Sequence, residues 1–178
     1  MKTTLSILLV LYFQMSFTHG KRDFEINLDS INCTMNPKYV SKSEFYIDKT
    51  MKHPQAFADI QMAHGVQSMT YSLKIELLKT NKDKMTLIDI KNADGCAFLD
   101  GKIEANLINI YRDMLAEAGN LPKCPIPADY HFVFNNVTID VERFPPFLPE
   151  AKFTLTAKTT ADKEFFYTLQ VNGSIKKK

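Results

Sequence analysis

The sequence predicts a mainly β fold: an immunoglobulin-like β-sandwich or β-cup of seven or eight antiparallel strands with one amphipathic helix. Three observations favour this fold class. Apolar and polar residues alternate in several short segments, which is the pattern of half-buried strands. Turn-forming residues separate these segments at short intervals, and a single segment changes to the spacing of a helix. The 178 residues suit one domain, because neither an internal repeat nor a linker divides them.

The strand pattern is clearest over residues 69–77, where apolar residues alternate strictly with polar ones. Residues 81–84 consist of Asn, Asp and Lys and predict a turn. Residues 85–91 then return as the hairpin partner of the first strand.

Two further strands are predicted before this hairpin. Residues 24–28 alternate, and a change of phase then places Ile31 and Cys33 at the inward positions. The same change turns Asn32 outward, toward water. Residues 44–48 predict a second, shorter strand.

Residues 102–118 change to helical spacing. Their apolar residues recur at steps of three and four, which places them on one face of an amphipathic helix. Gly119 follows at the position of a C-terminal cap. The apolar stripe consists of Ile103, Leu107, Ile110, Met114 and Ala118.

Strands resume after the helix, and two features interrupt them. The alternation changes phase at Asn135 and Asn136, which predicts a bulge or a break that leaves Asn136 facing water. Residues 144–149 contain three prolines, which cannot donate to a sheet ladder, so this segment is not a central strand. The predicted strands of this half are residues 130–134, 137–141, 153–157 and 165–171.

The first twenty residues have the features of a secretory signal peptide. Lys2 precedes an apolar stretch that begins at Leu5, and the stretch ends before a charged segment. We place the cleavage after Gly20, so that residues 21–178 form the single secreted, extracellular domain. An uncleaved membrane anchor is the alternative, but the apolar stretch is short for one. The mature protein is therefore not expected to span a membrane.

The three cysteines, Cys33, Cys96 and Cys124, allow three single pairings, and an oxidising compartment favours pairing. We favour a disulfide between Cys96 and Cys124, because these residues bracket the predicted helix and a bridge would join it to the rest of the domain. Cys33 would then be a buried thiol or form an intermolecular bridge, and burial is the more usual environment of a cysteine. Three Asn-x-Ser/Thr sequons also fit secretion. The predicted glycosylation sites are Asn32, Asn136 and Asn172.

Motifs for catalysis, metal binding and nucleic-acid binding are missing from the sequence. The formal net charge is +2 without a basic stripe, so no nucleic-acid partner is expected. His53, His64 and His131 do not lie at metal-ligand spacing with cysteines or carboxylates. Neither a nucleophile elbow nor a glycine-rich phosphate loop is present. We therefore expect no enzymatic activity, no metal and no cofactor.

The remaining informative residues are apolar: 13 Phe, 8 Met and 7 Tyr. They could fill an ordinary packed core, or they could line a cavity between two splayed sheets. Candidates for the cavity come from the inward face of the 69–77 strand, from the helix stripe and from the strand after the helix. They are Met69, Tyr71, Leu73, Ile75, Ile103, Leu107, Ile110, Met114, Phe132 and Phe134.

Short motifs follow one another in a recognisable order along the chain. They are Ile31-Asn32-Cys33, Cys96-Ala97-Phe98-Leu99, the predicted helix, Cys124-Pro125, Asn136-Val137-Thr138-Ile139-Asp140 and Leu148-Pro149-Glu150-Ala151-Lys152-Phe153. Together they resemble a large insect family of small secreted proteins that includes the chemosensory B proteins of gustatory bristles. That family is similar in turn to the ML (ganglioside-activator-like) lipid-recognition superfamily, whose members are β-cups that hold lipid between two sheets.

The resemblance implies an apolar ligand, either a lipid or a cuticular-hydrocarbon-like pheromone, and a role in chemosensory or gustatory perception. It also implies a sensory receptor or ion channel as a further partner. Many members carry a second cysteine soon after the first, and residues 44–47 of this chain contain none. Cys33 therefore lacks the partner that the family would supply.

Three hypotheses about function follow. The first is a secreted binding protein for an apolar ligand. The second is an extracellular interaction module, or an accessory protein of a receptor or channel, that has no ligand cavity. The third is a secreted hydrolase, which stays open because two of the 20 acidic residues could meet in space.

Overall fold

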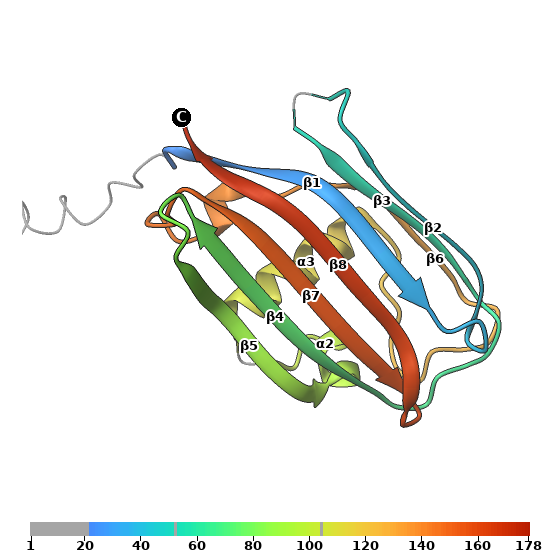
Figure 1. Cartoon of the computed structure of the whole chain (residues 1–178). Helices are drawn as coiled ribbons and strands as arrows, with labels where there is room; N and C mark the ends of the chain where they lie inside the picture. Colours follow the sequence, from blue (N-terminus) through green and yellow to red (C-terminus); the bar gives the residue numbers. More distant parts are fainter. Residues whose placement is uncertain (1–21, 52, 104) are drawn as a thin grey trace, which may run out of the picture.

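The computed structural model describes residues 22–178 except positions 52 and 104, so the predicted signal peptide lies outside the described residues. Within the described part of the chain, eight strands form two antiparallel sheets that face one another (Figure 1). The predicted fold class, a mainly β sandwich or cup, is confirmed.

The larger sheet has five strands in the order β1-β8-β7-β4-β5. The predicted hairpin is present, because β4 pairs with β5 in antiparallel register. The strands that the sequence placed near both ends of the chain pair with each other as β1 and β8. The bounds are Phe24–Met35 for β1, Met69–Lys79 for β4, Lys84–Asp94 for β5, Ala151–Ala161 for β7 and Glu164–Lys177 for β8.

The smaller sheet has three strands in the order β2-β3-β6, with bounds Val40–Asp48, Gln55–Met62 and His131–Val137. Strand β3 was not predicted from the sequence. Here small Ala56 and Ala58 line the interior, and the larger Phe57 between them stacks on the exposed ring of Tyr46 at 4.8 Å and also contributes to the cavity wall. Small residues at inward positions and a large aromatic residue between them conceal the period of two.

Both predicted changes of phase are register shifts in the sheets. In β1 the shift lies between Leu28 and Ser30, opposite β8. In β6 two residues, Asn135 and Asn136, lie opposite a single residue of β3, and Asn136 takes a positive φ of 57°. The expected strand over residues 137–141 is wrong, because β6 ends at Val137 and a single 3-10 turn, η2 (Val141–Arg143), follows. Asp140 caps that turn by accepting a hydrogen bond from the Glu142 backbone N–H.

The predicted helix is present as α3 (Asn106–Ala118), which begins four residues later than expected. A second short helix, α2 (Gly95–Leu99), was not predicted, because Asp94-Gly95 resembles a turn. Asp94 instead caps α2, and its carboxylate accepts hydrogen bonds from the backbone N–H groups of the first turn. The predicted disulfide between Cys96 and Cys124 is confirmed, with a Cα–Cα distance of 5.5 Å. It joins α2 to the segment that follows α3.

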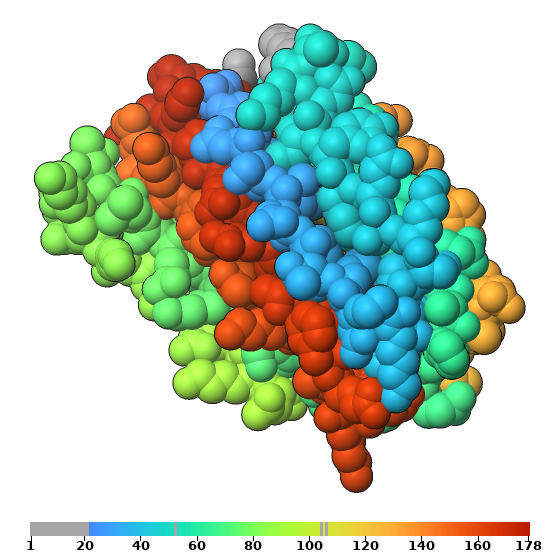
Figure 2. All heavy atoms as spheres, turned by 45° about the vertical axis from the view of Figure 1, so that its right-hand side comes forward, coloured from blue at the N-terminus to red at the C-terminus, as the bar shows by residue number. Residues whose placement is uncertain are grey.

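The two sheets differ in width, and α3 makes up the difference. The helix lies beside β6 and covers the part of the larger sheet that the three-stranded sheet does not reach (Figure 1). Ile108 of α3 packs on Tyr71 and Leu73 of β4 in one buried cluster. On the opposite side β1 and β2 are in contact, and their atoms lie side by side along that edge (Figure 2). None of the described helices is long and apolar enough to cross a lipid bilayer.

Two clusters of buried side chains fill the ends of the sandwich. One lies where β4 begins and β7 ends, and includes Met69 and Ala161. The other lies where β4 ends and β7 begins, and includes Leu77 and Ala151. These clusters hold the two layers together at both ends of the strands.

Gly119 ends α3, but not through the left-handed conformation expected of a helix-capping glycine. Its backbone is extended (φ −171°) and forms a bridge with Phe134 of β6. A Cβ at this position would overlap the carbonyl group of Val133 and the ring of Phe134. The close approach of helix end and strand therefore requires glycine here.

Substitution Gly119→Ala should lower the free energy of unfolding by about 2 kcal/mol, because the added methyl group meets backbone atoms that cannot move aside cheaply. Urea unfolding followed by circular dichroism measures the loss. The comparison is Gly95→Ala, where the new Cβ meets side-chain atoms of the buried Met69 and no backbone atom, so we expect a smaller loss. Equal stability of the two variants would contradict the close packing of α3 on β6.

Candidate ligand cavity

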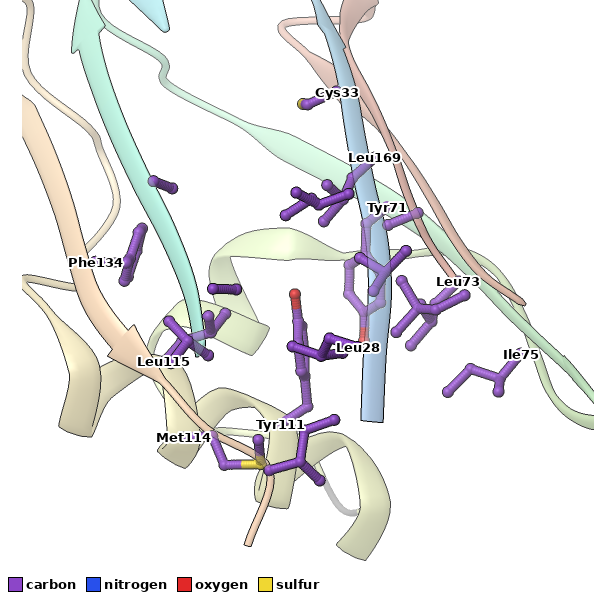
Figure 3. Close-up of a pocket in the computed structure, with 18 of the residues that line it drawn as sticks. Leu28, Cys33, Tyr71, Leu73, Ile75, Tyr111, Met114, Leu115, Phe134 and Leu169 are labelled. Carbon is purple, nitrogen blue, oxygen red and sulfur yellow. The ribbon is translucent and has the colours of Figure 1, made fainter. Parts of the chain in front are cut away.

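A cavity of about 330 Å³ lies between the two sheets and α3. This volume falls at the lower end of the range of small-molecule sites. Its wall is built from the inward side chains of both sheets and from one face of the helix, and these are almost all apolar. In Figure 3 the side chains of β1, β4, β8, α3 and β6 point toward this common space.

Most of the candidate residues from the sequence lie in the wall of this cavity. They are Met69, Tyr71, Leu73, Ile75, Leu107, Met114, Phe132 and Phe134. Ile103 and Ile110 are not part of the wall. Ile103 precedes the helix and packs against the cluster around Ile108. The inward face of α3 is instead formed by Leu107, Ile108, Tyr111, Met114 and Leu115.

Strands β1, β7 and β8 contribute a part of the wall that was not proposed from the sequence. The register across the sheet places Leu73, Ala157, Leu169 and Cys33 in one row, because each residue pairs with the next. Alternation had already placed most of these side chains inward. It could not distinguish a position that faces a cavity from one that fills a core.

Four hydroxyl groups interrupt the apolar wall. Tyr71 of β4 pairs with Thr159 of β7, which pairs with Tyr167 of β8, so three of them form a row across the sheet. Tyr111 reaches the same space from α3 (Figure 3). Burial raises the pKa of all three tyrosines, so their hydroxyl groups remain protonated hydrogen-bond donors. Tyr71 Oη and Thr159 Oγ1 are buried, and among the described residues neither makes a hydrogen bond of good geometry. Thr159 lies close enough to Tyr167 to offset part of the rise in the pKa of Tyr167.

The opposite end of the cavity carries only apolar side chains. Phe153 of β7 pairs with Leu77 of β4 and Gly173 of β8, and Phe144 and Leu148 close the end from the proline-rich loop. A Cβ at Gly173 would overlap the ring of Phe153 and the carbonyl oxygen of Asn27. The missing side chain therefore lets the Phe153 ring lie against β8.

Charged side chains lie outside the cavity wall. Among the described residues, none of the side chains that form the wall is acidic or basic. The exposed His131 lies on β6 and is hydrogen-bonded to Asp59 at 3.0 Å, which lowers the pKa of Asp59. Across residues 22–178, apart from the two undescribed positions, no group of three His, Cys, Asp or Glu side chains is arranged to hold a metal.

The three sequons differ in exposure. Asn32 on β1 and Asn136 at the β6 bulge are exposed. Asn172 is only partly exposed, on β8 between its neighbours in the sheet. Its Nδ2 donates to Ser30 Oγ at 3.0 Å, and its Oδ1 accepts from Thr154 Oγ1 at 2.9 Å. The geometry therefore favours Asn32 and Asn136 as the accessible glycosylation sites.

Residues 69–155 match a protein family of unknown function, DUF1091. The matched segment runs from the first residue of β4 into β7 and includes both cysteines of the disulfide. The match agrees with the resemblance to the ML-like secreted proteins as a broad group. It does not single out the chemosensory B proteins within that group. No curated protein matches the chain.

The thiol of Cys33 should react slowly with iodoacetamide in the folded protein. Cys33 is the free cysteine of the chain and lines the cavity, where burial raises its pKa from 9.0 to about 12. Only the thiolate is the nucleophile, so at pH 8 we expect labelling at least about a hundredfold slower than in urea. Between pH 8 and pH 10 the folded-state rate should rise about tenfold per unit, whereas the urea rate should level off. Fast labelling of the folded protein would contradict a thiol turned into the cavity.

Proposed function

We propose that the protein is a secreted binding protein that holds an apolar ligand, a lipid or a hydrocarbon-like molecule, between its two sheets. The observation that carries this proposal is the apolar cavity of about 330 Å³ between well-packed ends. Protein interiors normally fill such space with their own side chains. A cavity of this size that is lined by apolar groups is therefore best explained by an occupant.

Binding of an apolar ligand in this cavity requires neither a cofactor nor a covalent reaction. Each methylene group that leaves water for an apolar cavity gains about 0.8 kcal/mol. The wall is preformed, because paired strands and a helix fixed by the disulfide hold it, so little conformational entropy is lost on binding.

Secretion and a chemosensory role complete the proposal. Disulfides persist in oxidising compartments, and the Cys96–Cys124 bridge and the two accessible sequons fit an extracellular protein. The chemosensory role, with a pheromone-like ligand and a sensory receptor or channel as partner, rests on the motif resemblance alone.

The cavity also bears on the competing hypothesis of an interaction module without a ligand. Such a module would act through its outer surface and would gain nothing from a hollow interior. Unfilled space between sheets forfeits packing contacts and lowers stability. The hollow therefore favours the ligand-binding hypothesis.

Filling the cavity from within should abolish binding without unfolding the protein. Ala157 lies in the middle of the wall between Leu73 and Leu169, and the change Ala157→Phe adds a ring there. We expect the wild type to bind the fluorescent probe N-phenyl-1-naphthylamine and to release it when a long-chain alkane is added. The variant should lose at least about tenfold in probe affinity at similar thermal stability.

The matched control is Thr156→Phe, which adds the same ring to the other face of the same strand, beside Lys74 and Gln170. This control should bind the probe as the wild type does. Failure of the wild type to bind, or equal binding by Ala157→Phe, would contradict the proposed function.

A further inference from the structure

The hydroxyl groups in the cavity point to the chemical class of the ligand. On the basis of the proposed function, we infer that the ligand is an uncharged long-chain molecule with one oxygen acceptor group, such as an ester, ketone or aldehyde. The acceptor group of the ligand lies at the row formed by Tyr71, Thr159 and Tyr167, and the hydrocarbon chain of the ligand extends toward Phe153. We call these three residues the hydroxyl row.

The hydroxyl row occupies one defined place in the wall. Its three residues pair directly across β4, β7 and β8, so their side chains stand next to one another on the inner face of the sheet. They meet the cavity at one end of its wall, beside the packed cluster that includes Met69 and Ala161. The polar groups are therefore concentrated and not scattered through the wall.

Two of these groups are short of hydrogen-bond partners. Tyr71 is 8% exposed and Thr159 is 1% exposed, and neither Tyr71 Oη nor Thr159 Oγ1 makes a hydrogen bond of good geometry, although Thr159 lies close enough to Tyr167 to interact with its hydroxyl group. Buried polar groups in proteins are nearly always paired, and an unpaired hydroxyl group is costly. A ligand oxygen that accepts from the row would supply the missing partner.

Helix α3 contributes a further hydroxyl group to this part of the cavity. Tyr111 extends from the helix into the space between Tyr71 and Leu28 on one side and Phe134 and Leu115 on the other (Figure 3). The side chains of Tyr167 and Cys33 are close enough to Tyr111 to contribute to the rise in its pKa, after burial itself. A fourth donor therefore faces the region of the hydroxyl row from the helical side of the cavity.

Because the described wall has no basic side chain, the acceptor group of the ligand should be uncharged. The described wall contains no lysine, arginine or histidine, so a carboxylate would be buried without a counter-ion, and that is strongly unfavourable. A neutral oxygen needs only the hydroxyl donors that are present. Ionised fatty acids are therefore poor ligands by this inference.

The far end of the cavity determines which way the hydrocarbon chain of the ligand points. Leu77, Phe144, Leu148 and Phe153 surround that end, and none of them offers a hydrogen bond from its side chain. A hydrocarbon tail gains most by lying there, because its methylene groups need only dispersion contacts and release from water.

The test compares three ligands that each contain a chain of about twelve carbon atoms, dodecane, dodecyl acetate and laurate, by displacement of N-phenyl-1-naphthylamine at neutral pH. The wild type should bind dodecyl acetate about tenfold more tightly than dodecane, and laurate more weakly than the acetate. The variants Tyr71→Phe, Tyr167→Phe and Thr159→Val keep the shape of the wall and remove one hydroxyl group each. Each should reduce the preference for acetate over dodecane by several-fold and leave dodecane affinity unchanged or higher.

The control is Tyr46→Phe, which removes an exposed hydroxyl group outside the cavity and should leave the preference intact. If none of the three ligands displaces the probe, the proposed function fails and this inference fails with it. If dodecane and dodecyl acetate bind equally well, and the variants leave their ratio unchanged, this inference fails while the proposed function stands. Tighter binding of laurate than of the acetate would also overturn it.

Discussion

The unequal width of the two sheets is the constraint on which the rest of the structure depends. A five-stranded sheet has more apolar surface than a three-stranded sheet can cover. Helix α3 covers the remainder, and the disulfide ties α2 to the segment beyond α3. A helix is thicker than a strand, so the layer opposite the large sheet is uneven. The space between the layers closes at the packed ends and stays open between them.

Much of the fold could be predicted from local sequence. Strict alternation identified β4, and the change to helical spacing identified α3. The pattern failed in β3, where small alanines stand at inward positions and the large Phe57 lies between them, so the period of two gave no clear signal. The short helix α2 was not recognised, since a helix of this length shows no period and Asp94-Gly95 also resembles a turn.

The cavity was harder to predict than the strands. Alternation places Leu73 or Leu169 inward, but it does not say whether the opposite layer lies in contact or at a distance. That distance is set by the placement of α3, which a sequence pattern cannot give. The helix also begins at Asn106 and not at residue 102, so Ile103 lies outside it. Its inward face includes Ile108 and Tyr111 and not Ile110, so the face is turned relative to the predicted stripe. Tyr111 lies outside that stripe and was therefore missed.

Gly173 has a consequence for how the interior could be adjusted. Its missing side chain makes room for the ring of Phe153, and of the two groups that a methyl group would meet there, only that ring can swing away, since the other is the backbone carbonyl of Asn27. The carbonyl has no such freedom, so a larger residue at position 173 would disturb the pairing of β1 with β8 before it changed the length of the cavity. The depth of this end of the cavity and the joining of the first and last strands therefore depend on the same glycine.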